Sequence, residues 1–248
     1  MNTINRVIVL GDSYTFGHGC SDREFQYDNS TKTFIGNETP FKKNIPSSHC
    51  WASLLQHQFS NIEVINLGKP ANCSQGLFRN LIEYHNEHPL SENDIIIYNG
   101  TFFDRIEIAS GSRPEVATPW AMGWDHHSQM ENKIPYNMAK KMYITHLFND
   151  DIGYNLSLTS LLATYGFATI HNLKFIWNLP IQAYPDTFLQ KLVCISKLQI
   201  PHISKYDFSG CEDYDINKTC YAPDHHVNDK GHLIYFEKEI IPLMQRLL

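Results

Sequence analysis

The stretch Arg6-Val-Ile-Val-Leu-Gly-Asp-Ser-Tyr-Thr-Phe-Gly17 indicates the fold of this chain. Its four consecutive apolar residues, 7–10, are typical of a strand that is buried on both faces of a sheet. The run stops at Gly11, so Asp12 and Ser13 follow where the strand ends. In an open α/β sheet, chemistry gathers at the carboxyl ends of the strands. The stretch therefore predicts a first strand that presents Ser13 as a nucleophile, although a polar turn without function fits the same residues.

Strands and helices are predicted to alternate along the rest of the chain. Further apolar runs predict strands at 62–68, 94–98 and 174–180 and an edge strand at 200–204. Apolar residues at helical spacing predict helices over 51–59, 73–88, 136–148, 152–171, 186–198 and 228–248, the first capped by Ser47 or Ser48 and the last bent at Pro242. The segments 21–48 and 102–135 have neither period and are expected to be irregular.

This alternation, without a repeat or a linker, predicts one domain over residues 1–248. We expect a three-layer α/β sandwich of the flavodoxin-like type, with a mostly parallel central sheet and helices on both faces.

Composition limits the partners of the protein. Hydrophobic residues make up 42% of the chain and charged residues 19%, which is typical of a folded globular protein. The net charge is -6 and there is no basic block, so neither nucleic acid nor an anionic membrane is expected as a partner. No apolar stretch is long enough for a membrane span or a signal peptide, and a cytoplasmic location is expected. Nothing in the sequence indicates an oligomeric state.

The six cysteines do not indicate a metal site. None lies in a Cys-x-x-Cys pair, so a zinc knuckle is not expected, and a chain of this size does not depend on disulfides for its core. We expect the thiols to be mostly reduced. Cys211 and Cys220, in one loop, are the pair to test for a disulfide bond.

A second polar cluster lies in Ala222-Pro-Asp-His-His-Val-Asn-Asp-Lys-Gly-His232, before the last predicted helix. A serine hydroxyl is a poor nucleophile until a base takes its proton, and the base is itself oriented by a carboxylate. Asp224 and His226 are two residues apart, so in extended backbone their side chains lie on the same side. Asn228 is suited to cap the helix that follows.

Together the two clusters resemble the first and last conserved blocks of the SGNH (GDSL) hydrolases. Gly11-Asp12-Ser13 matches the Gly-Asp-Ser block. His226-Val-Asn228 and Gly231-His232 match the block written Asp-x-x-His-Pro-Asn-x-x-Gly-His. The resemblance implies an esterase in which Ser13 attacks, His226 is the base and Asp224 orients it. Because the aspartate is one residue nearer than usual, His225 is the alternative base, and the asparagine and glycine that follow favour His226.

The two middle blocks depart from the family pattern. Ala71 stands where a glycine usually donates its N–H to the oxyanion, and a backbone donor survives that change if φ is negative. Phe102 stands where an asparagine side chain usually donates, which phenylalanine cannot do. Thr101 is the first candidate to replace that asparagine, ahead of Asn99 and Asn72.

The resemblance therefore implies hydrolysis of an ester through an acyl-enzyme, without a metal or other cofactor. An acetyl or other short acyl group on a carbohydrate is the first expectation for the substrate, with lipid and thioester substrates open. Two other classes stay open. Phe102 is compatible with a weak or inactive carbohydrate-binding module on the same fold. The cluster of Asp224, His225, His226 and His232 is compatible with a metal-dependent hydrolase.

Overall fold

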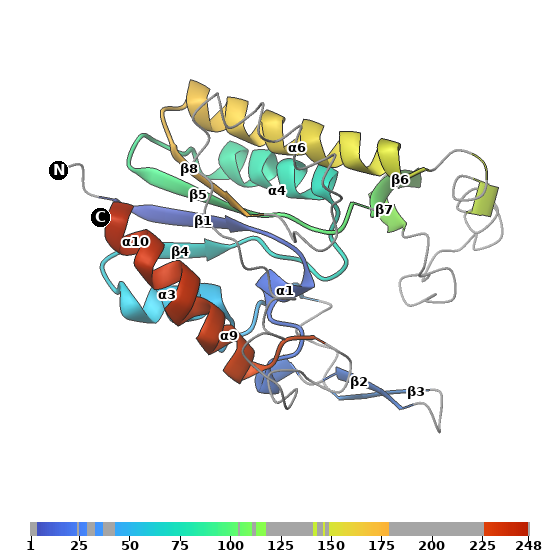
Figure 1. Ribbon diagram of the computed structural model, residues 1–248, viewed down its shortest axis with the longest axis horizontal. Helices are drawn as coiled ribbons and strands as arrows, with labels where there is room; N and C mark the ends of the chain where they lie inside the picture. The colour runs from blue at the N-terminus through green and yellow to red at the C-terminus, as the bar shows by residue number, and fades with distance from the viewer. Residues whose placement is uncertain are drawn as a thin grey trace.

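The computed structural model describes residues 4–23, 25–28, 33–36, 43–103, 105–110, 113–117, 141–142, 146, 149–178 and 226–247 (Figure 1). The predicted helix 186–198 and the predicted edge strand 200–204 lie outside these residues, as does most of the predicted helix 136–148. The same is true of Asp224, His225, Cys211 and Cys220.

Four parallel strands form the central sheet. They are β1 (Arg6–Leu10), β4 (Glu63–Asn66), β5 (Asp94–Asn99) and β8 (Lys174–Asn178), in the order β4-β1-β5-β8. Each of them matches a strand predicted from an apolar run. The chain passes from β1 to β4 on one side and then to β5 on the other, so the strand order reverses at β1. Such a reversal opens a crevice at the carboxyl ends of the strands, where the residues after Leu10 lie.

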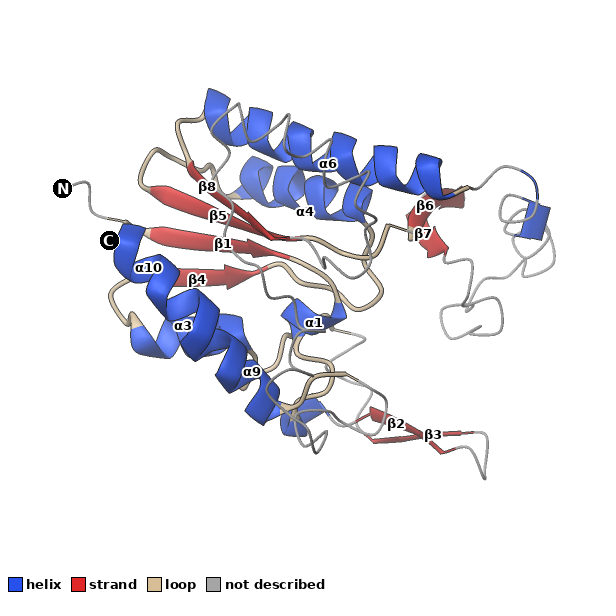
Figure 2. Cartoon of the chain, in the orientation of Figure 1, coloured by secondary structure: helices blue, strands red, loops and turns tan. Residues whose placement is uncertain are grey.

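Two layers of helices cover this sheet (Figure 2). On one face lie α4 (Ser74–Glu87) and α6 (Asp150–Ile170). On the other face lie α3 (Trp51–Gln58) and two C-terminal helices, α9 (Asp229–Tyr235) and α10 (Ile241–Leu247). Among the described residues, no helix is long and apolar enough to cross a membrane.

The core divides into two clusters because successive residues of a strand point to opposite faces. Val7 and Val9 of β1 belong to the cluster that contains α3 and the C-terminal helices. Ile8 and Leu10 belong to the cluster that contains α4 and α6. All four side chains are fully buried, so β1 is covered on both sides. The predicted three-layer sandwich with a parallel sheet is confirmed.

Two antiparallel hairpins lie outside this frame, in segments expected to be irregular. One pairs β2 (Phe25–Asp28) with β3 (Thr33–Gly36), and the other pairs β6 (Ile106–Ser110) with β7 (Arg113–Ala117). None of the four has a continuous apolar run like those by which β1 and β5 were predicted. The expectation of irregular structure was therefore wrong at these four strands.

Helix α3 does not begin at the predicted cap. Its N-cap is Cys50, with no side-chain capping bond. The hydroxyls of Ser47 and Ser48 instead donate to the carboxylate of Asp22, at 2.5 and 2.8 Å. A carboxylate accepts stronger hydrogen bonds than a neutral group does, so it draws both hydroxyls away from the helix terminus.

The closing helix is capped as the sequence indicates, and its regular hydrogen bonding is interrupted ahead of Pro242, where a bend was expected. The side chain of Asn228 accepts hydrogen bonds from the backbone N–H groups of Lys230 and Gly231. Between α9 and α10 the helix widens into a π-helical turn at Phe236–Ile240, directly before Pro242. Proline has no N–H and its ring clashes with the carbonyl four residues earlier, so the regular ladder cannot pass through it.

Candidate active site

Ser13 begins the four-residue helix α1 (Ser13–Phe16), directly after β1. Asp12 is the N-cap, and its Oδ1 accepts a hydrogen bond of 3.0 Å from the backbone N–H of Tyr14. Gly17 ends the helix in the left-handed region, at φ 83°, which a side chain disfavours. Asp12 and Gly17 thus fix the two ends of α1, which holds Ser13 at the carboxyl end of a central strand.

The structure brings Ser13 together with His226. The Nε2 of His226 lies 3.1 Å from the Oγ of Ser13, although the two residues are 213 positions apart. This distance is within hydrogen-bond reach of a nucleophile and its base. Asp224 and His225 lie outside the described residues, so the role of the carboxylate stays a prediction.

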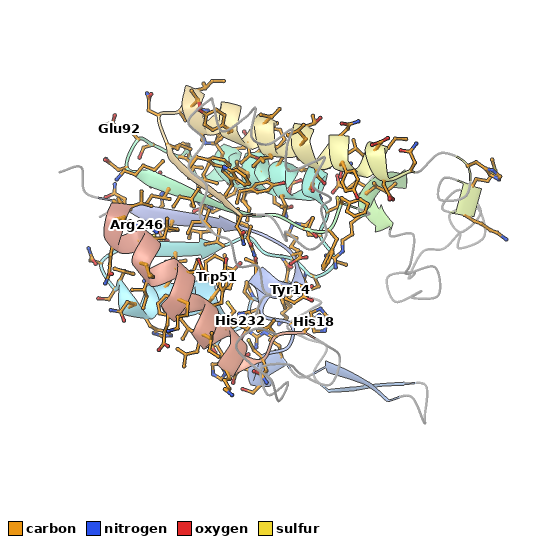
Figure 3. The ribbon with its side chains drawn as sticks, viewed as in Figure 1. Tyr14, His18, Trp51, Glu92, His232 and Arg246 are labelled. Carbon is orange, nitrogen blue, oxygen red and sulfur yellow. The ribbon has the colours of Figure 1, made fainter. Side chains whose placement is uncertain are left out.

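Aromatic rings form a row beside this contact. The ring of His18 stacks on His226, with centroids 4.2 Å apart and an angle of 13°. Tyr14 lies 5.4 Å from His226 and 6.4 Å from Phe102, centroid to centroid. All four side chains are half-buried. Figure 3 shows Tyr14 and His18 at the carboxyl end of the sheet, near the start of α9. Sequence reasoning missed His18 and Tyr14 because no spacing relates them to His226.

A buried ion pair lies next to Ser13 in the structure, at Asp12. The Nη1 of Arg105 is 2.7 Å from the Oδ2 of Asp12, and both side chains are less than a tenth exposed. The guanidinium carbon also lies 4.9 Å from the centre of the Phe102 ring. Asp12 and Arg105 are 93 positions apart, so the sequence carries no signal for their pairing.

The candidates for the missing oxyanion donor are engaged in this same region. The Oγ1 of Thr101 is 3.0 Å from both the Oδ2 of Asp12 and the carbonyl oxygen of Asn72, and it accepts from Arg105 at 2.9 Å. Its single hydrogen is therefore used inside the protein. The side-chain amide of Asn72 donates to the Gly11 carbonyl, and that of Asn99 donates to the hydroxyl of Thr15. A donor role for Thr101 stays a prediction, and it requires the hydroxyl to turn.

Ala71 does not have the negative φ that its proposed role as a backbone donor required. Its φ is 56°, in the left-handed region, rather than negative. A side chain there meets the following carbonyl oxygen, at a cost of about 1–2 kcal/mol. The turn between β4 and α4 thus has a conformation suited to glycine and is occupied by alanine. Strain of this kind is often found at functional sites.

His232 has a structural place in the fold. Its side chain is fully buried, and its Nδ1 accepts a hydrogen bond of 3.4 Å from the backbone N–H of Trp51, at the start of α3. Burial lowers the pKa of His232 to about 3, so the ring is neutral at pH 7. Among the described residues, no three His, Cys, Asp or Glu side chains are grouped to hold a metal ion.

Three cysteines lie in the core as free thiols, namely Cys20, Cys50 and Cys73. Burial raises the pKa of each thiol, so all three are protonated at pH 7 and unsuited to act as nucleophiles.

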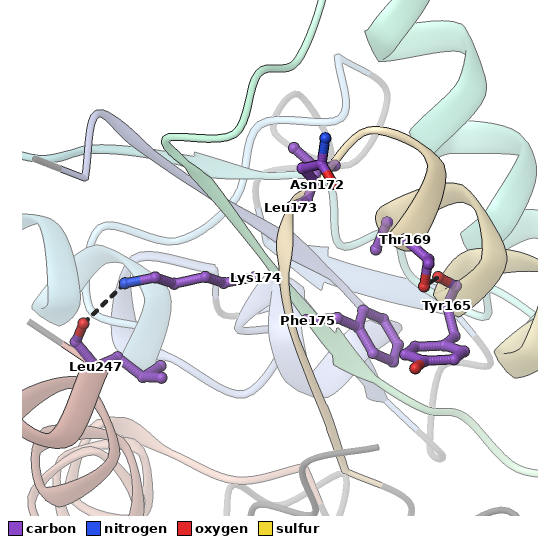
Figure 4. Close-up of a pocket in the computed structure, with 8 residues that line it drawn as sticks. Tyr165, Thr169, Asn172, Leu173, Lys174, Phe175 and Leu247 are labelled. Atoms are coloured by element: carbon purple, nitrogen blue, oxygen red, sulfur yellow. Dashed lines mark hydrogen bonds between the residues drawn. The ribbon is translucent and has the colours of Figure 1, made fainter. Parts of the chain in front are cut away.

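A cavity of about 500 Å³ lies at the opposite end of the sheet (Figure 4). Lys174, the first residue of β8, lines it and donates a hydrogen bond of 2.9 Å to the carbonyl oxygen of Leu247. Ser13 follows the last residue of the parallel strand β1, so this cavity is separate from the candidate site.

Replacement of Ala71 by glycine should stabilise the protein. Glycine adopts a positive φ without strain but loses more entropy on folding, so the expected net gain is about 0.5–1 kcal/mol. Urea unfolding monitored by circular dichroism measures it. Asn172→Gly is the matched control, since Asn172 has φ 55° but asparagine tolerates this region. Equal gains at both positions would contradict the strain at Ala71.

Acid should destabilise the fold partly through His232. Because its pKa is lower in the folded state than the ordinary value of 6.5, the unfolded chain binds more protons between these values. The free energy of unfolding therefore falls as the pH falls below about 6.5, by up to about 1.4 kcal/mol per pH unit. His232→Gln removes this contribution. Urea unfolding at pH 7, 6 and 5 should show a flatter dependence for the variant, and parallel curves would refute the assignment.

Comparison with known proteins gives a match in structure only. No protein-family model matches the sequence, and no curated protein matches it. The psychrotrophic esterase EstA from Pseudoalteromonas sp. is 14% identical, with 98% of each chain covered and a TM-score of 0.54. TesA is 13% identical, with 98% of this chain and 100% of that chain covered and a TM-score of 0.53.

A member of the lipolytic G-D-S-L family from Veillonella parvula is 13% identical, with 94% of each chain covered and a TM-score of 0.50. At these identities the likeness concerns the fold and not the activity. The chain has the three-layer α/β fold of the G-D-S-L, or SGNH, hydrolases.

Proposed function

We propose that this protein is a serine esterase. The observation that carries the proposal is the distance of 3.1 Å between the Oγ of Ser13 and the Nε2 of His226. The contact lies at the carboxyl end of β1, where the strand order reverses and where open α/β sheets bind their ligands. The shared fold of solved esterases supports the same reading.

In the proposed reaction, the Oγ of Ser13 attacks the carbonyl carbon of an ester while His226 takes the hydroxyl proton. The tetrahedral intermediate collapses, and His226 returns this proton to the departing alkoxide, which leaves an acyl group on Ser13. A water molecule then attacks the acyl-enzyme, with its proton passing to His226 and from there to Ser13. Asp224 is proposed to orient the imidazole and to stabilise its charged form.

The negative oxygen of the intermediate needs donors that are in place beforehand. We assign the backbone N–H groups of Ser13 and Ala71 to this role, as the family resemblance implies. The φ of Ala71 is positive rather than negative, so its N–H can serve only because the alanine keeps the backbone conformation suited to the usual glycine. Thr101 joins them only if its hydroxyl turns away from Asp12 and Asn72. With Phe102 in the position of the usual asparagine, we expect an enzyme of modest turnover.

For the substrate we propose a short acyl ester, acetyl first, on a carbohydrate or another small alcohol. The half-buried rings of Tyr14, which lies 5.4 Å from His226, and of Phe102, which lies 6.4 Å from Tyr14, support this class, because an aromatic face packs well against the apolar face of a sugar ring. A non-catalytic binding module on the same fold is the second candidate, favoured by the loss of the amide donor at Phe102.

Loss of the nucleophile should abolish the activity. Hydrolysis of p-nitrophenyl acetate by Ser13→Ala is expected to fall by about 10⁴–10⁶ in kcat, since serine and its base act as one unit. Activity of both proteins is measured with and without a chelator. Activity that survives the mutation but not the chelator would point to a metal-dependent hydrolase. A folded wild type without activity on acetyl esters, including acetylated sugars, would favour the binding module.

A restored amide donor should accelerate the reaction. Loss of one oxyanion donor in an optimised site costs about 10²–10³ in turnover, so Phe102→Asn is expected to raise kcat by roughly tenfold if the amide reaches the oxyanion. Phe102→Leu is the matched control, because leucine has nearly the shape of asparagine and no donor. A gain shared by both variants would show that space, not hydrogen bonding, limits turnover. No gain in Phe102→Asn would place the oxyanion elsewhere.

A further inference from the structure

We propose that His18 is a positioning residue that holds the ring of His226 toward Ser13. The proposal rests on the esterase function proposed above and adds to it a residue outside the serine, histidine and aspartate set. It concerns the flat imidazole ring of His18 and does not require that ring to carry a charge.

His18 contacts both partners of the reacting pair. Its backbone N–H donates a hydrogen bond of 3.0 Å to the carbonyl oxygen of Ser13. Its ring stacks on the ring of His226, with centroids 4.2 Å apart and planes within 13° of parallel. His18 thus links the ring of His226 to the backbone of Ser13.

The residues that follow His18 hold the segment 18–21 close to the segment 226–229. A Cβ on Gly19 would lie 2.6 Å from the carbonyl oxygen of Val227 and 2.9 Å from the Cβ of His226, so only glycine allows this approach. The backbone N–H and hydroxyl of Ser21 donate to the carboxylate of Asp229, at 2.9 and 2.6 Å. The segment 18–21 is therefore fastened to the chain on both sides of Asn228, the cap of α9.

The ring of His226 needs such support because its χ2 torsion has only weak intrinsic preferences. Rotation about the bond between Cβ and the ring has broad minima, so the backbone alone does not fix the direction of Nε2. Stacked aromatic faces favour near-parallel rings, and Tyr14 adds a second ring contact at 5.4 Å. A misplacement of 1 Å in a reacting group can cost about a hundredfold in rate.

The test compares the wild type with His18→Ala, which removes the ring, and His18→Phe, which keeps a flat ring without nitrogen. His57→Ala is the matched control, since His57 is exposed on α3. The readouts are kcat and KM for p-nitrophenyl acetate, with thermal unfolding to establish that each variant is folded.

We expect His18→Ala to lower kcat about 10–100-fold with KM changed less than about threefold, because the ring aligns the base and does not bind the ester. We expect His18→Phe to regain most of that loss and His57→Ala to behave as the wild type. Wild-type kcat in His18→Ala, or equal losses in the alanine and phenylalanine variants, would overturn the proposal. If His18→Ala does not fold, His18→Leu replaces it, since leucine fills the space without a flat ring and should show the same loss.

A second readout separates this proposal from the proposed function. The ring-current shift of the His226 ring protons in the NMR spectrum should be lost in His18→Ala and kept in His18→Phe, whether or not the protein hydrolyses esters. An active wild type whose His226 resonances and kcat are both insensitive to His18 defeats the positioning role alone. A wild type that is inactive on every ester would contradict the esterase proposal. It would also remove the catalytic role proposed for the stacking of His18 on His226.

Discussion

The carboxylate of Asp12 connects the end of β1 to the end of β5 and to the helix that carries Ser13. One oxygen caps α1 through the N–H of Tyr14, and the other pairs with the guanidinium of Arg105. Both side chains are buried, and removal of one member of a buried ion pair typically costs about 3–5 kcal/mol because the other charge is left alone. The position of Ser13 therefore depends on the ion pair made by its neighbour Asp12.

A different set of contacts holds His226 beside Ser13. Helix α9 is capped by Asn228, two residues after His226, and its buried His232 accepts a hydrogen bond from the start of α3. The same loop is fastened to the segment after α1 through Ser21 and Asp229. Burial alone would raise the pKa of Asp229, but the hydrogen bonds from Ser21 and the adjacent His49 outweigh it and lower the pKa. The hydrogen bonds between Ser21 and Asp229 are thus made to an ionised carboxylate at neutral pH.

The oxyanion side of the site is where this chain differs from the pattern it resembles. Ala71 keeps the left-handed backbone suited to glycine and accepts the strain, while Phe102 replaces an amide with a ring that packs near Tyr14 and over Arg105. An aromatic ring thus stands where the family pattern has an amide donor. In the esterase proposed above, this difference would leave one oxyanion donor fewer, which is the reason to expect a modest turnover.

Local signals in the sequence determined much of the fold. The apolar runs predicted all four strands of the central sheet, and the helical spacing predicted α3, α4, α6 and the capped closing helix, because these signals need only a few neighbouring residues. The two hairpins were missed because their strands lack a continuous apolar run. Gly11-Asp12-Ser13 and the histidine loop were recognisable as motifs, each within a dozen residues.

Only the tertiary structure decided how these motifs meet. The pairing of Asp12 with Arg105 and the stacking of His18 on His226 join residues far apart in the chain, and sheet register and helix packing set such contacts rather than sequence spacing. The positive φ of Ala71 and the engaged hydroxyl of Thr101 likewise depend on the turn and the ion pair around them. The sequence thus predicted Ser13 and His226 as a candidate nucleophile and base, and the packing of strand ends and loops determined that the two side chains meet and which groups surround them.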